Sequence, residues 1–303
     1  MKNIRTVMYV KRECVKPMKN FLPISISIII SALVAYGVVQ YSGSKKATDT
    51  TIAETAYTRV MRTHTIRCGY SVRYPHIMKD PNSGKLSGVS YDYMQALGEK
   101  LSLKIEWVQE AGLGEMVQDL KVHKYDAFCT FVWPTAGRAR EIDFIAPAAR
   151  VPVLPYARKD DMRFDGSLAK MNSPMVRFVV IDGYAQTRMV SDQFPNAQKI
   201  SLPETSSPDV PFQNVLANKG DIVLAEPPFA AEFNRKNGEV VRLIPGITLA
   251  DFPESIAIPG NEYQLQRMLS LATDELVNNG TMKKIFQSYG VENFFISIAQ
   301  ANP

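Results

Sequence analysis

The 303-residue chain has little of what metal centres and disulfide scaffolds are built from. It contains three cysteines and three histidines, without a C-x-x-C motif or a histidine pair at metal-ligand spacing. The G-x-S-x-G elbow, the Walker loop and the G-x-G-x-x-G fingerprint are also absent. These absences argue against common hydrolases, nucleotide enzymes and metalloenzymes, and no metal or cofactor is expected. Paired catalytic carboxylates would leave no such local signature.

Net positive charge is confined to the N-terminus. The chain has 35 Lys and Arg against 30 Asp and Glu, a formal charge of +5. Residues 1–20 contain six basic side chains and one acid, Glu13, so this leader alone carries +5 and the other 283 residues balance. Because nucleic-acid binding needs a basic surface, the neutral body argues against nucleic acid as a partner.

A long uncharged run comes after the basic leader. No Asp, Glu, Lys or Arg lies between Phe21 and Ser44, and such a run can cross about 30 Å of hydrocarbon. Basic residues before the span favour a cytoplasmic N-terminus and export of the chain beyond the span. We therefore expect 1–20 to be a cytoplasmic leader and 21–43 an inner-membrane anchor. A long signal peptide is the alternative, although no clean A-x-A-like cleavage site is found after the run.

The region after the anchor is expected to begin with a polar linker and a short amphipathic helix over residues 44–64. If this part is exported, Cys68 and Cys129 lie in an oxidising compartment and could pair. Three cysteines do not make a disulfide scaffold, and we expect these two to be separate small side chains buried on strands.

From residue 65 onward, strand and helix patterns alternate. The order is βαβαβ, which predicts a parallel sheet with helices on both faces. A second α/β series begins at residue 176, and short extended connectors flank it, so two lobes with a cleft between them are expected. In the first series, strands are expected at 66–70, 104–108 and 126–132, and helices at 90–101 and 115–122.

Three blocks of sequence match one family pattern. Residues 65–108 contain a strand ending in Gly, a Tyr-Pro loop, a Gly-Lys turn and a helix entered through G-x-x-x-D. Residues 120–147 contain T-x-x-R and D-F-x-x-P, and residues 220–233 contain a strand that ends in an acid. The chain thereby resembles the amino-acid-binding family of type II periplasmic solute-binding proteins (bacterial extracellular solute-binding protein family 3) over about residues 60–295.

This resemblance implies an α/β, two-lobed periplasmic-binding-protein-like fold of type II, whose chain crosses twice at a hinge. The first lobe would comprise 65–150 and 252–296, and the second 151–251. Arg138 would bind a ligand carboxylate through its planar fork, and Glu226 would bind the ammonium from the other lobe. A ligand that bridges the two would favour closure of the cleft.

The chain also departs from the family pattern at the expected site. Trp133 replaces a hydroxyl residue two positions before Thr135, and Tyr184 and Ala185 come after Gly183 where Ser or Thr is usual. Amide groups at this helix start could still hold an anion. The residues expected to contact the ligand are Arg138, Glu226, Tyr74, Trp133, Phe131, Thr130, Tyr184 and Ala185.

The function expected is that of a periplasmic substrate-binding protein, exported or tethered to the inner membrane. It would capture an amino acid or a related small polar carboxylate and deliver it to an ABC transporter permease. Two alternatives stay open. One is a ligand-sensing receptor module that signals through a membrane partner. The other is a dehydratase that resembles the cyclohexadienyl (arogenate or prephenate) enzymes of the same fold, with Glu226 or His76 as the acid-base group.

Overall fold

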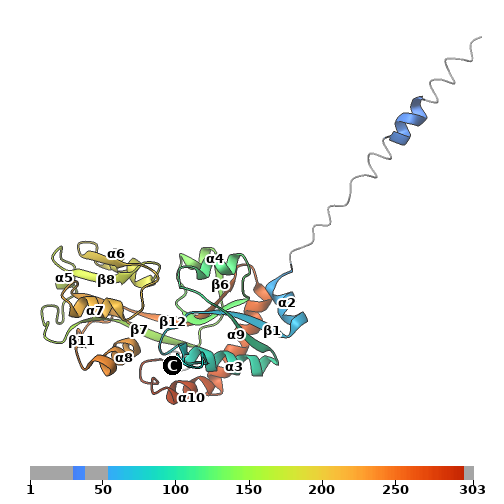
Figure 1. The fold of residues 1–303 in the computed structure, drawn as a ribbon. Coiled ribbons are helices and arrows are strands. Elements are labelled where there is room, and N and C mark those ends of the chain that lie inside the picture. Colours follow the sequence, from blue (N-terminus) through green and yellow to red (C-terminus); the bar gives the residue numbers. More distant parts are fainter. Residues whose placement is uncertain (1–29, 38–53, 297–303) are drawn as a thin grey trace, which may run out of the picture. The chain divides into compact units, whose positions relative to one another are not determined.

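The computed structural model describes residues 30–37 and 54–296 (Figure 1). The chain divides into two units, residues 1–53 and 54–303. In the first, residues 30–37 are helical and exposed. Among the residues described, no helix is long and apolar enough to cross a membrane. Most of the predicted anchor at 21–43 lies outside the described residues.

The second unit consists of alternating helices and strands. The helices are α2 (Ala56–Thr63), α3 (Val89–Leu101), α4 (Met116–Lys121), α5 (Leu168–Met171), α6 (Ala185–Gln193), α7 (Val210–Leu216), α8 (Pro227–Asn237), α9 (Tyr263–Asn278) and α10 (Thr281–Ser288), with a 3₁₀ turn η1 (Arg138–Arg140). The strands are β1 (Thr65–Tyr70), β2 (Met78–Lys79), β3 (Leu86–Ser87), β4 (Lys104–Glu110), β5 (Ala127–Val132), β6 (Ile142–Phe144), β7 (Ala149–Arg158), β8 (Arg177–Ile181), β9 (Gln198–Leu202), β10 (Ile222–Ala225), β11 (Val241–Leu243) and β12 (Ala250–Pro259).

The strands form two parallel groups joined by two long strands. The order along the sheet is β4-β1-β5-β12-β7-β10-β8-β9. Strand β1 is parallel to β4 and β5, and β8 is parallel to β9 and β10. Between the groups, β7 and β12 pair antiparallel with each other (Figure 1). We call the β4-β1-β5 group with its helices the first lobe, and the β10-β8-β9 group with its helices the second lobe.

The expected extended connectors are thus strands of ten residues each. The first half of β7 pairs with β12, and its second half pairs with β10 and β11. This pairing supports our proposal that 65–150 and 252–296 make up the first lobe and 151–251 the second.

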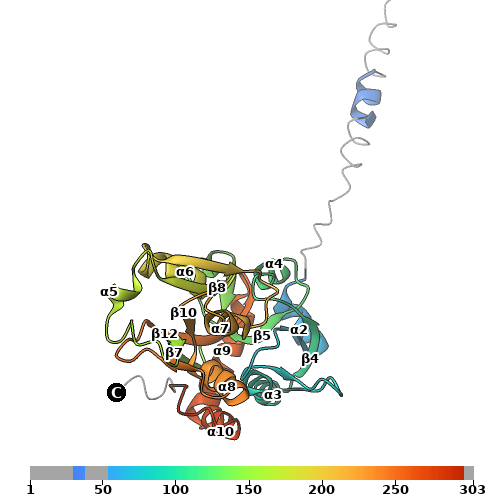
Figure 2. The same cartoon turned by 60° about the vertical axis from the view of Figure 1, so that its left-hand side comes forward.

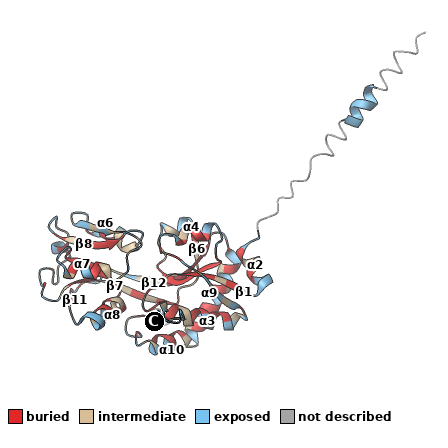
Figure 3. Ribbon diagram, viewed as in Figure 1, coloured by how far each residue is buried: buried red, intermediate tan, exposed pale blue. Residues whose placement is uncertain are grey.

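Apolar patterning explains why these segments form the core. Every residue of β5 and β10 is buried, as in strands covered on both faces. Buried residues are also found along β1 and β12 (Figure 3). In α3 the buried positions Val89, Tyr93 and Leu97 recur every four residues and so lie on one face. Helix α3 packs against α9 and α10 in the first lobe, and α6 and α7 pack on β8 in the second (Figure 2).

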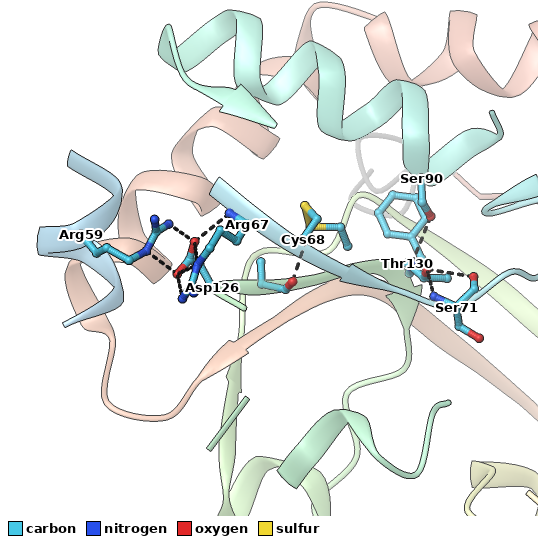
Figure 4. The surroundings of a disulfide bond; sticks show 10 residues. Arg59, Arg67, Cys68, Ser71, Ser90, Asp126 and Thr130 are labelled. Atoms are coloured by element: carbon cyan, nitrogen blue, oxygen red, sulfur yellow. Dashed lines mark hydrogen bonds and ion pairs between the residues drawn. A yellow bond between two sulfur atoms is a disulfide. The ribbon is translucent and has the colours of Figure 1, made fainter. Parts of the chain in front are cut away.

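A disulfide joins β1 to β5 (Figure 4). The expectation that Cys68 and Cys129 remain separate is wrong. The two strands are parallel neighbours, with Cys68 opposite Ala127, and this register brings the two cysteine Cα atoms to 5.4 Å. That separation lies within the range of a disulfide. The bond fixes the strand pair from which the first lobe's cleft residues extend.

A buried carboxylate holds the opposite ends of the same strands together. Asp126 directly precedes β5 and is 1% exposed. It accepts hydrogen bonds from the Arg67 backbone at 2.7 Å and from the Arg59 Nε at 2.8 Å, and the Arg67 side chain pairs with it as well (Figure 4). Helix α2 is thereby anchored to β1.

Candidate functional site

Charged and aromatic side chains gather where strands of the two lobes end. Arg73 and Trp133 come after β1 and β5 in the first lobe, and Glu226 comes after β10 in the second. Glu254 lies on β12, in the part that pairs with β7. In open α/β sheets ligands bind beyond the carboxyl ends of the strands, so this cluster marks the candidate site.

An ion pair between Arg73 and Glu226 bridges the lobes. Arg73 Nη1 donates to Glu226 Oε1 at 3.0 Å, and Nη2 donates to the Phe131 carbonyl at 3.1 Å. The two residues are 6% and 1% exposed. Burial alone would raise the pKa of Glu226, but the Arg73 charge and a hydrogen bond from His76 lower it. Glu226 is therefore ionised and paired inside the protein.

His76 contacts the second carboxylate oxygen of Glu226. Its Nε2 lies 3.3 Å from Glu226 Oε2, and the residue is fully buried. Burial and the neighbouring Arg73 charge lower the pKa of His76, so the ring is neutral near pH 7. Because an ionised carboxylate can only accept, the proton resides on Nε2. The other ring nitrogen, Nδ1, is buried and has no hydrogen-bond partner within residues 30–37 and 54–296.

Glu254 is a second buried carboxyl group with the opposite shift. Burial and the negative charge of Glu226 raise the pKa of Glu254 to about 8, against a smaller lowering effect of Arg73. Trp133 Nε1 donates to Glu254 Oε1 at 3.1 Å, while Oε2 is buried and has no partner in the described part of the chain. The indole stacks on Phe252 at 4.5 Å between ring centroids. Trp133 thus joins the end of β5 to β12.

Ligand atoms of His76, Glu226 and Glu254 lie within 4.8 Å of one another. Their chemistry would suit a divalent cation. However, the Arg73 guanidinium already neutralises Glu226, and Glu254 is protonated near pH 7. A cation would have to displace Arg73, and we propose no metal here.

Arg138 lies in the first lobe at η1, beside an open groove. Its Nη1 donates to the Trp133 carbonyl at 3.0 Å, and its backbone N–H donates to Thr135 Oγ1 at 3.3 Å. Among the described residues, Nε and Nη2 have no partner. Arg62 uses the same two nitrogens, Nε and Nη2, to donate to both carboxylate oxygens of Glu54. Burial, and then repulsion by Arg73, lower the pKa of Arg138 to about 10.

The groove beside Arg138 has a volume of about 780 Å³ and is lined from both lobes. Thr135 and Arg138 line it from the first lobe, and Tyr184, Ala185 and Arg188 line it from the start of α6. Tyr184 makes no capping hydrogen bond through its side chain. An adjoining cavity of about 20 Å³, large enough for one water, is lined by Arg73, Trp133 and Arg138 among others.

Of the residues expected at the site, Arg138, Trp133, Tyr184 and Ala185 line these adjoining cavities together. Tyr74 lines a separate groove beside α8. Burial is complete at Phe131 and Thr130. The Thr130 hydroxyl accepts from the Ser71 N–H at 2.9 Å and donates to the Ser71 carbonyl at 3.1 Å (Figure 4). Direct ligand contact by any of these residues remains a prediction.

Arg73 and Glu254 are not among the site residues predicted from the sequence. The sequence feature that indicates Glu254 is a charged residue followed by the apolar run of β12. Arg73 precedes Tyr74 in a loop and carries no local signal, because its partner is 153 residues away.

Comparison with known proteins gives one consistent result. The family model of bacterial extracellular solute-binding proteins, family 3, matches residues 66–292. The probable amino-acid-binding protein YxeM of Bacillus subtilis is 24% identical over 233 residues, covering 74% of this chain and 82% of that protein.

Solved structures show the same fold. An ancestral amino acid-binding protein, a precursor of cyclohexadienyl dehydratase, superposes with a TM-score of 0.67 and 22% identity, covering 77% of this chain and 98% of that one. An amino acid ABC transporter substrate-binding protein from Streptococcus pneumoniae, bound to L-arginine, superposes with a TM-score of 0.66 and 19% identity, covering 77% and 97%.

Proposed function

Because this chain belongs to the bacterial extracellular solute-binding proteins of family 3, we propose that it captures a small carboxylate outside the cytoplasm and delivers it to an ABC importer. The observation that carries the proposal is the unpaired Nε–Nη2 edge of Arg138 in a groove lined by both lobes. A planar guanidinium edge binds a carboxylate through two parallel hydrogen bonds. The amino-acid-binding relatives support a ligand of amino-acid size.

Binding would act through the two connecting strands. Arg138 belongs to the first lobe and the start of α6 to the second, so a ligand that contacts both favours the closed arrangement. Strands β7 and β12 carry both crossings, and we propose that the hinge lies in their paired segments, 149–153 and 250–254.

An extracytoplasmic location is supported by the Cys68–Cys129 disulfide, because such bonds persist in oxidising compartments. We propose the periplasm, with residues 21–43 as the inner-membrane tether or export signal.

The test is a thermal-shift screen of the full chain against amino acids and small carboxylates. A ligand at one hundred times its dissociation constant stabilises the folded protein by about 2.7 kcal/mol. Arg138→Ala should abolish this shift. Arg140→Ala, which removes an exposed arginine of the same turn, should retain it. Equal shifts in wild type and Arg138→Ala would refute the role of Arg138.

An enzyme is the second candidate, favoured by one observation. Glu254 is a carboxylic acid protonated near neutral pH, and one structural neighbour is a precursor of cyclohexadienyl dehydratase. A general acid needs such a raised pKa. Incubation with prephenate and arogenate decides this point, since a dehydratase forms phenylpyruvate or phenylalanine and a binding protein returns the substrate unchanged.

A further inference from the structure

The acid expected to hold a ligand's ammonium group already holds a cation of the protein. We propose that the ligand is a small organic carboxylate without a free ammonium group, because Arg73 fills the ammonium position at Glu226 when the two lobes meet. This inference rests on the proposed function and specifies its substrate class.

Both carboxylate oxygens of Glu226 already have a partner within the protein. One carboxylate oxygen accepts from Arg73 at 3.0 Å and the other faces His76 Nε2 at 3.3 Å. Only 1% of the residue is exposed, and the cavity of about 50 Å³ that it lines is also lined by Arg73, so a ligand ammonium there would lie beside the guanidinium charge. Displaced from Glu226, Arg73 would be a buried guanidinium without a counter-charge, which is costly.

The charges of the cluster lead to the same ligand class. Arg73 and Arg138 are positive, Glu226 is negative, and His76 and Glu254 are neutral near pH 7, so the cluster carries +1. A carboxylate without an amino group brings this sum to zero. A zwitterion leaves it at +1, with an extra cation close to two guanidinium groups. Uncompensated charge in a site removed from water is unfavourable.

Two further arginines lie near Arg138, one at the small adjoining cavity and one at the groove. Arg73, which is 6% exposed, lines the small cavity, and its Nε has no hydrogen-bond partner among the described residues. Arg188 lines the groove from α6, and its guanidinium lies close to Gly137 of the first lobe. Asp192 is the acid in this lining, yet among the described residues no carboxylate pairs with Arg138 or Arg188. The groove thus offers excess positive charge to an anion.

One competing arrangement would admit an amino acid. The positive charge of its ammonium could lower the pKa of Glu254, which would then release its proton to solvent and become the counter-charge. Such binding near pH 7 would release close to one proton per ligand, since the pKa of Glu254 is about 8. Binding of an amine-free carboxylate to Arg138 requires no such proton release.

The experiment is isothermal titration calorimetry of the full chain with matched monocarboxylate pairs, namely propionate with alanine, 3-methylbutanoate with valine, and 3-phenylpropionate with phenylalanine. For every pair that binds, we expect the amine-free member to bind at least about tenfold more tightly. Tighter binding of the amino acids, with proton release measured in buffers of different ionisation enthalpy, would overturn this inference and leave the proposed function standing. If no carboxylate of either kind bound, both would fall.

A charge-switch variant provides a second test. Arg73→Met removes the guanidinium and keeps an unbranched apolar side chain about as long as the aliphatic stem of arginine. Glu226 then becomes available to an ammonium group. The preference within each pair should shift by at least about tenfold towards the amino acid. The matched control is Arg73→Met with Glu226→Gln, which removes both charges and should not show this shift. A folded single variant with unchanged preference would contradict the inference. If the single variant does not fold, the wild-type pairs decide.

Discussion

Replacing Glu254 by Gln should remove a pH-dependent loss of stability. The pKa of Glu254 is about 8 in the folded protein, against an ordinary value of 4.5. Between these values the folded protein keeps the proton that the unfolded chain releases. Stability therefore falls as pH rises from about 4.5 to 8, because the folded state binds more protons over this window.

The size of the effect is set by the same two values. Each pH unit in the window is worth about 1.4 kcal/mol, so by pH 7 the wild type has lost about 3 kcal/mol relative to pH 4.5. Gln cannot ionise, and its Oε1 can still accept from Trp133 Nε1. Its amide N–H groups would occupy the position of Oε2, which has no partner, and this adds a cost that does not depend on pH. We therefore predict how the unfolding free energy of the two proteins changes with pH, and not which of them is more stable at a given pH.

Urea unfolding at pH 5, 6, 7 and 8 measures this slope. The difference in unfolding free energy, Glu254→Gln minus wild type, should rise steadily across the series. Glu226 and His76 are unchanged in both proteins, so their contributions largely cancel in the difference. Glu106→Gln, at an exposed position, controls for the change in net charge. Parallel curves for Glu254→Gln and wild type would refute the reasoning, since they would mean that Glu254 is ionised in the folded protein throughout.

Two further predictions concern the base of the first lobe. Breaking the Cys68–Cys129 bond, by reductant or by paired Cys→Ser changes, should cost about 4 kcal/mol, because the bond closes a loop with a sequence separation of 61 residues in the unfolded chain. Unchanged urea midpoints would contradict this. Asp126→Asn should cost about 3 kcal/mol, because it leaves two arginines without their buried carboxylate. Glu54→Gln, which breaks an exposed pair, is its control and should lower the melting temperature much less.

Local patterns are sufficient to predict most elements of the fold. Helix α3 is predicted at 90–101 and occupies Val89–Leu101, because its apolar spacing repeats with the helical period. The sequence predicts only short connectors where the long strands β7 and β12 lie. Pro152, Pro155 and Pro253 interrupt their patterns, and proline cannot donate to a strand ladder. Their antiparallel pairing is a property of the assembled sheet, as is the register that joins Cys68 to Cys129.

The site is predictable to the extent that it resembles its family. Arg138 belongs to a recognisable motif, and the structure places it in a groove between the lobes. Glu226 is also identified from the sequence, with the ammonium of a ligand as its expected partner. Its partner in the structure is Arg73, a residue of the first-lobe loop after β1. No periodicity or motif contains that pairing, because it exists only when the two lobes meet.

The Arg73–Glu226 pair has a cost that stability alone does not explain. Removing two charges from water is expensive, and a buried ion pair is seldom more stable than well-packed apolar side chains in its place. This pair lies at the candidate site and occupies the acid that would otherwise attract an ammonium group. We infer that the Arg73–Glu226 pair lies here because it selects the ligand by charge. A carboxylate can reach Arg138 through the groove without breaking the pair, whereas a ligand ammonium at Glu226 would have to displace Arg73 or lie beside its positive charge.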